Sequence, residues 1–193
     1  MPIELTLADQ TRLVAALRDA LGAGVRVIET HISYVLLAGG YAYKIKKAVS
    51  LGFVDCSTLA LRRRYCEEEL RLNRRLAPAV YLDVVPIAGT VERPSPGGAG
   101  PPIEFAVRMR EFPQESLLAR EIERGELSAR EVDALAAIVA AFHSRIAVAS
   151  PADGYGSPDE VLAYARENFE HLERLRGDPA EREALAALRG WTE

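Results

Sequence analysis

The stretch from residue 33 to residue 47 constrains the fold most, because it predicts two strands joined by a tight turn. β-Branched and aromatic residues flank Gly39 and Gly40. Successive glycines can adopt the positive φ angles of a short turn, so this pattern is typical of a β-hairpin. Side chains alternate between the faces of a strand, and Ala42, Lys44 and Lys46 are therefore expected on one face of the second strand. That face carries two cations.

A long helix is expected to follow, roughly over residues 58–76, with Asp55 or Ser57 as its cap and Pro78 beyond its end. Four side chains recur at three- and four-residue spacing and predict the face that packs inward. They are Tyr65, Glu69, Leu72 and Leu76. One member of this inward face is a carboxylate.

A buried carboxylate is costly unless a cation or a hydrogen bond meets it. We therefore expect Glu69 to pair with Lys44 of the hairpin. Two alternatives stay open, because Lys46 shares the face of Lys44 and Glu68 is adjacent to Glu69. The spacing of the inward face favours Glu69 over Glu68 as the buried carboxylate.

The other segments complete an α+β pattern. A helix capped by Thr6 and Asp9 precedes a first strand at 25–28. Further strands are expected at 81–87 and 103–110, with a flexible loop rich in Pro and Gly at 94–102, so the sheet has about five strands. The remaining helices are expected over 114–124, from a capping box at Ser128, from Ser157 and from Pro179. Strands followed by helices indicate two parts that meet near residue 113.

Composition argues against several classes of protein. The net charge is −4 and Lys and Arg form no concentrated basic face, which argues against nucleic acid as the main partner. No apolar run approaches the ~18 residues of a membrane span, and no signal segment is present, so we expect a cytoplasmic protein. The two cysteines and three histidines lack the spacing of a metal site.

The hairpin and helix together resemble a known fold. A Gly turn, then Tyr-Ala-Tyr-Lys-Ile at 41–45, then a helix with an inward glutamate is similar to the N-terminal lobe of the protein-kinase-like fold. More particular runs resemble the aminoglycoside-phosphotransferase-like domain of bacterial proteins that usually carry a P-loop ATP-binding domain downstream. These runs lie at 29–33, 43–47, 52–55, 67–76, 81–87, 106–110 and 142–143.

The resemblance implies an N-lobe over residues 1–112, with about five antiparallel strands and one long helix, and a helical, incomplete C-lobe over 113–193. It also implies that Lys44 holds the phosphates of ATP and that Glu69 orients Lys44. Backbone groups near Val107 to Met109 would hold the adenine, with the Met109 thioether as a wall. A phosphate cradle would use Thr30, Ser33 and backbone N–H groups. Alternatively, Val107 and Met109 are core residues and the turn at 29–33 is a plain hairpin turn.

Kinases of this kind carry a catalytic loop resembling His-Gly-Asp and a later metal-binding Asp, and neither run occurs before Glu193. His143 lies inside a predicted helix and does not supply that loop. We therefore expect the ligands of Mg²⁺ outside this chain, and no turnover by this chain alone. The implied function is nucleotide binding within a small-molecule kinase that phosphorylates a hydroxyl acceptor. The alternative is a non-catalytic module that binds a nucleotide or a protein.

Overall fold

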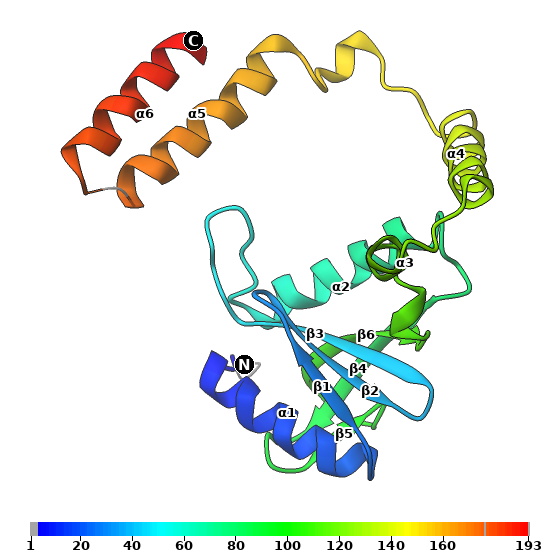
Figure 1. The fold of residues 1–193 in the computed structure, drawn as a ribbon. Coiled ribbons are helices and arrows are strands. Elements are labelled where there is room, and N and C mark those ends of the chain that lie inside the picture. Colours follow the sequence, from blue (N-terminus) through cyan, green and yellow to red (C-terminus); the bar gives the residue numbers. More distant parts are fainter. Residues whose placement is uncertain (1–3, 176, 193) are drawn as a thin grey trace. The chain divides into compact units, whose positions relative to one another are not determined.

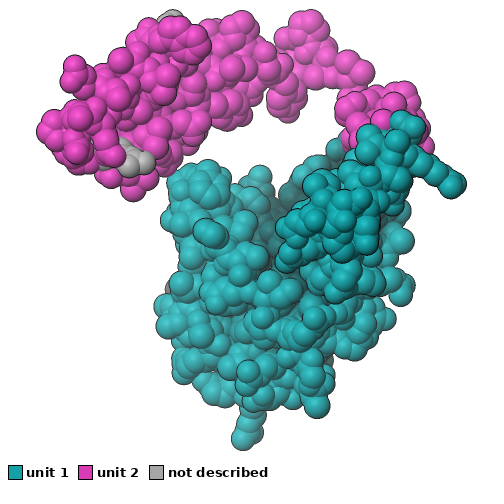
Figure 2. All heavy atoms as spheres, in the orientation of Figure 1, with its two compact units in different colours: residues 1–135 teal, residues 136–193 magenta. Residues whose placement is uncertain are grey.

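The computed structural model describes residues 4–175 and 177–192 and divides the chain into two compact units. The first comprises residues 1–135 and the second residues 136–193 (Figure 2). The first unit is of mixed α+β class and holds the sheet. The second unit is helical in its described part.

The sheet of the first unit is antiparallel throughout. Its strands lie in the order β1-β2-β3-β6-β4-β5 (Figure 1). They are β1 (Arg26–Glu29), β2 (Ser33–Ala38), β3 (Tyr41–Lys46), β4 (Tyr81–Gly89), β5 (Pro94–Pro96) and β6 (Pro102–Arg110). The predicted hairpin is β2–β3, where Gly39 and Gly40 have φ angles of 58° and 79°. This prediction is confirmed.

The sheet has six described strands, whereas the sequence predicted about five. The additional strand, β5, lies inside the segment 94–102 that was expected to be only a flexible loop. Gly89 takes a φ of 92°, and hydrogen bonds between Thr90 and Arg93 fold the chain back onto β4. Proline lacks a backbone N–H, so a proline-rich strand is confined to a sheet edge, and this is where β5 lies.

Two helices cover opposite faces of the sheet (Figure 1). Helix α1 (Leu7–Leu21) begins at the predicted Thr6–Asp9 capping box, and its apolar residues join Leu36, Ile45 and Ala106 in one core cluster. Helix α2 (Leu59–Asn73) packs on the other face, where Cys66 joins Phe105 and Val107. Because Ala106 and Val107 are successive residues of β6, their side chains point to opposite faces.

The predicted boundaries and inward face of α2 need correction. Thr58 caps the helix by accepting a hydrogen bond from the Leu61 N–H, in place of Asp55 or Ser57, and the helix ends at Asn73 rather than near residue 76. Leu72 and Leu76 are exposed. The residues of α2 that are buried are Leu59, Arg62 and Cys66. The inward face is rotated because Arg62, which was not among the predicted inward residues, has a buried partner on β6.

The helical segments follow β6. The expected helix at 114–124 is two pieces, η1 (Gln114–Ser116) and α3 (Leu118–Arg124), because Leu117 has an extended backbone. Helix α4 (Ala129–His143) begins at the predicted capping box, where Ser128 donates from its N–H and hydroxyl to Glu131.

The second unit contains η2 (Pro151–Asp153), α5 (Pro158–Leu175) and α6 (Pro179–Thr192). Helices α5 and α6 lie side by side, with Phe169 buried and Arg189 paired with Glu173 (Figure 1). None of the described helices is both long and apolar enough to cross a membrane.

Candidate functional site

Two lysines of β3 share one carboxylate of α2. Lys44 Nζ lies 2.8 Å from Glu69 Oε1, and Lys46 Nζ lies 2.6 Å from Glu69 Oε2. The Lys44–Glu69 pair predicted from the sequence is confirmed, and Lys46 is a second partner. Glu68 pairs instead with Arg71 on the exposed side of the helix.

The electrostatics of this cluster favour an anion. Burial acts to raise the pKa of Glu69, but hydrogen bonds and charge from Lys44 and Lys46 outweigh it, and the pKa lies below its ordinary value. The carboxylate is therefore ionised at neutral pH, and the three groups carry one net positive charge. Lys44 is the more accessible cation, since its side chain is 28% exposed and that of Lys46 is 11% exposed.

Lys44 lines a cavity of about 310 Å³. Strands β1, β2 and β3 form one wall, and the end of β6 with the segment that follows it forms another. The lining residues are Ile28, Thr30, Val35, Leu37, Ala42, Lys44, Tyr81, Met109, Arg110, Glu111, Phe112 and Gln114. The volume lies in the range of small-molecule sites. A largely apolar cavity with the Lys44 ammonium group on its wall suits a ligand with a flat apolar part and an anionic part.

The predicted site residues are only partly brought together. Lys44, Met109 and Thr30 line the cavity, whereas Ser33 and Val107 do not. Val107 is fully buried in the core cluster beneath α2, as in the alternative interpretation of that residue. Ser33 is also fully buried, and its N–H donates to the Thr30 hydroxyl, which stabilises the turn between β1 and β2. A role for either residue in nucleotide binding stays a prediction.

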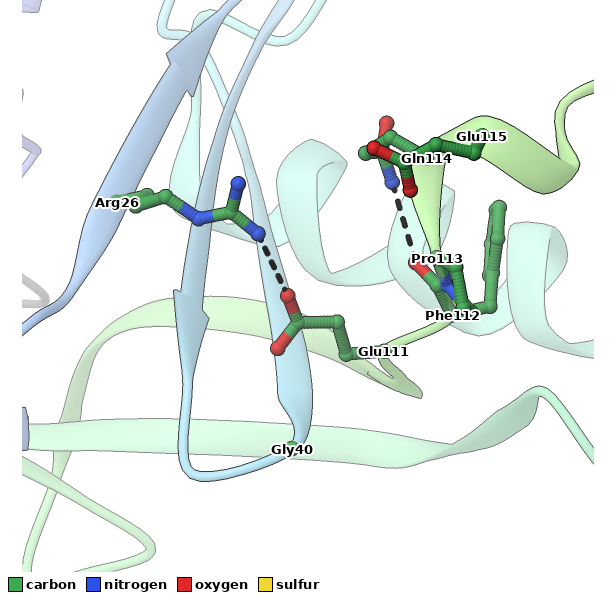
Figure 3. A pocket seen from close by; sticks show the side chains of 7 residues that line it. All are labelled: Arg26, Gly40, Glu111, Phe112, Pro113, Gln114 and Glu115. Carbon is green, nitrogen blue, oxygen red and sulfur yellow. Dashed lines mark hydrogen bonds and ion pairs between the residues drawn. The ribbon is translucent and has the colours of Figure 1, made fainter.

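A second, more polar cavity of about 460 Å³ adjoins the first, and the two share Glu111, Phe112 and Gln114. Figure 3 shows Arg26 from β1 directed toward Glu111. Arg26 Nη2 lies 2.9 Å from Glu111 Oε1. This ion pair ties the edge strand β1 to the segment after β6. It therefore helps to hold the two walls of the Lys44 cavity together.

Sequence reasoning missed a buried polar cluster next to the site. Arg62 and Glu104 are both fully buried, with 3.0 Å between Arg62 Nε and Glu104 Oε2, and Gln10 Nε2 donates to the same oxygen at 2.7 Å. Burial raises the pKa of Glu104, and the charge of Arg62 opposes that rise. A signal was present in the sequence, because Glu104 has an apolar residue on each side in a predicted strand.

The described residues contain no group of three or more His, Cys, Asp or Glu side chains arranged to hold a metal ion. We therefore assign no metal ligands within them.

The chain is similar to proteins of mycobacteria. One protein of Mycobacterium bovis and one from each of two strains of Mycobacterium tuberculosis are 37% identical to it over 152 residues. The match covers 79% of this chain and 28% of each relative, so the chain spans little more than a quarter of their length. All three are described as uncharacterized proteins. No protein-family model and no solved structure matches the chain.

Proposed function

We propose that the Lys44 cavity binds ATP and that the chain is the nucleotide-binding part of a small-molecule kinase with a protein-kinase-like fold. The observation that carries the proposal is the ammonium group of Lys44 on the cavity wall, held by a helix carboxylate at 2.8 Å. A cation on a rigid strand, oriented by a carboxylate on a facing helix, is the arrangement that kinases use to hold nucleotide phosphates. The resemblance of the sequence to aminoglycoside phosphotransferases supports the same assignment.

The apolar part of the cavity suits the base. Ile28, Val35, Leu37 and Ala42 provide an aliphatic wall, and Met109 provides a polarisable thioether. The backbone N–H groups of Arg110 and Glu111 already donate to Val80 and Gly40. We therefore assign contacts with the polar edge of the base to the next backbone groups, the Glu111 carbonyl and the Phe112 N–H.

Lys44 is assigned to the phosphates because it is the lysine that lines the cavity. When its ammonium group turns toward a phosphate, Glu69 keeps the hydrogen bond from Lys46. The buried carboxylate thus remains paired with nucleotide bound. Mg²⁺ would supply charge neutralisation for the phosphates, and the acceptor would be a small molecule with a hydroxyl group.

A calorimetric titration with MgATP tests the proposal. We expect the Lys44→Ala variant to bind at least tenfold more weakly than the wild type, about 1.4 kcal/mol. Arg71→Ala is the matched control, because it removes a cation from the exposed side of α2 and should leave affinity unchanged. Equal affinity of wild type and Lys44→Ala would remove Lys44 from the site. A wild type that does not bind MgATP would count against the nucleotide site and favour the non-catalytic module.

A further inference from the structure

We propose that Arg62 and Glu104 are positioning residues that hold α2 so that Glu69 meets the two lysines of β3. The proposal rests on the function proposed above, because its consequence is the orientation of Lys44 in the nucleotide site. Neither residue lines the cavity. Both therefore act through Glu69 and β3 rather than on a ligand.

The pair lies beyond the point where two neighbouring strands of the sheet stop pairing. Strands β3 and β6 are paired only as far as Ile45 and Ala106. Glu104 lies beyond that point, opposite Ile87 of β4, on the face that packs against α1. Arg62 comes from α2 on the other face. Its guanidinium group reaches Glu104 where β3 has separated from β6, so the ion pair connects the two faces of the sheet.

Arg62 fixes the beginning of α2 by several contacts. Its Nε lies 3.0 Å from both oxygens of Glu104, and its Nη1 donates to the carbonyls of Cys56 and Ser57 at 3.1 Å. Glu69 follows Arg62 by seven residues, close to two helical turns, so both side chains lie on one face of the helix. A rotation of α2 about its axis that moves Arg62 away from Glu104 therefore also moves Glu69 away from Lys44.

The same cluster fixes the end of β3. The Gln10 amide donates to Glu104 Oε2 at 2.7 Å and to the Lys46 carbonyl at 2.9 Å, and its oxygen accepts the Ala48 N–H at 2.6 Å. The strand that carries both lysines and the helix that carries their carboxylate are thus anchored to one buried group, Glu104.

The cluster is not arranged for stability alone. Arg62 Nη2 is buried without a hydrogen-bond partner among the described residues, and such a group destabilises the folded state. Replacing a buried ion pair with apolar residues of similar volume is often neutral or stabilising. Apolar residues, however, would not supply the directional hydrogen bonds that fix the rotation of α2 about its axis. This difference separates a positioning role from a merely structural one.

The test compares wild type with the double variant Arg62→Met/Glu104→Leu. Three quantities are measured: the melting temperature, the pKa of the Glu69 carboxyl by NMR, and the affinity for MgATP. We expect a melting temperature close to that of the wild type. The pKa of Glu69 should rise toward the ordinary value of a glutamate carboxyl, and the affinity for MgATP should fall at least fivefold.

An unchanged Glu69 pKa in the folded double variant would overturn the positioning role, whatever the affinity. If the wild type does not bind MgATP, the proposed function fails, and the Glu69 pKa still decides the positioning role. If the double variant does not fold, the Arg62→Lys variant tests the positioning role. It keeps a cation opposite Glu104 but lacks the guanidinium group that also donates to the carbonyls of Cys56 and Ser57. A wild-type Glu69 pKa in Arg62→Lys would then overturn the proposal.

Discussion

The sharing of Glu69 by two lysines predicts that the three residues contribute very unequally to stability. Replacing Lys44 with Met leaves Glu69 paired with Lys46 at 2.6 Å. Replacing Glu69 with Gln leaves two ammonium groups side by side without an anion. The loss of the carboxylate should therefore cost far more free energy of unfolding than the loss of Lys44.

The magnitudes follow from exposure. Removing one partner of a fully buried ion pair costs about 3–5 kcal/mol, and an exposed pair contributes about 0.2–1 kcal/mol. Glu69 and Lys46 are close to the buried limit, with side chains 12% and 11% exposed, and Lys44 is 28% exposed. We expect Glu69→Gln to cost about 2–4 kcal/mol and Lys44→Met about 1 kcal/mol or less.

Urea denaturation at pH 7 measures both values, and equal m-values will show that the two variants unfold from equally compact states. Arg71→Gln serves as the control, because its pair with Glu68 is largely exposed and its removal should leave the free energy of unfolding nearly unchanged. Equal losses for Lys44→Met and Glu69→Gln would refute the argument, since they would mean that Lys46 does not hold the carboxylate in solution.

Three further predictions concern acid, thiols and a turn. Because the folded pKa of Glu69 lies below its ordinary value, the ionised carboxylate adds to the free energy of unfolding above about pH 4.3, and this contribution is lost as pH falls further. Urea midpoints measured from pH 7 to pH 3 should therefore fall more steeply for wild type than for Glu69→Gln. Burial raises the pKa of Cys66 to about 12, so its thiol should react with a disulfide reagent at pH 8 only after denaturation. Gly89→Ala should lower the free energy of unfolding by about 1–3 kcal/mol, because φ is 92° and the new Cβ would clash with the Arg93 carbonyl. Gly97 also has a positive φ but has open space around it, so Gly97→Ala should lower the free energy of unfolding less in the same urea assay.

The hairpin and the Lys44–Glu69 pair could be predicted because their signals are local. Adjacent glycines between β-branched residues identify the turn, and alternation along β3 places both lysines on one face. A buried carboxylate needs a cation, and Lys44 and Lys46 on one face of β3 are therefore the expected partners of Glu69. Val107 and Met109 lie on the same face of one strand, however, and alternation does not show how far a cavity extends along that face. The sequence therefore could not show that Met109 lines the cavity and that Val107 is a core residue.

The buried cluster could not be predicted in the same way, because its partners are far apart in sequence. Arg62 and Glu104 are 42 residues apart, and Gln10 and Glu104 are 94 residues apart. Arg62 begins a run of three arginines, so nothing in the local pattern separates it from its neighbours, and the periodicity argument assigned the inward face to residues 65, 69, 72 and 76. This error rotated the predicted face of α2 toward Leu72 and Leu76. The edge strand β5 was missed because its two prolines suggest a loop and only backbone pairing defines it.

If Lys44 binds phosphate as we propose, the second lysine explains how a buried carboxylate can serve that site. With Lys44 alone, movement of the ammonium group toward a phosphate would leave Glu69 unpaired at 12% exposure, and that cost would subtract from the affinity. Lys46 removes most of this cost, because it keeps a 2.6 Å hydrogen bond to the other carboxylate oxygen. Lys46 is itself held by Gln10, which binds its carbonyl. Thus α1, which does not line the cavity, contributes to the availability of Lys44.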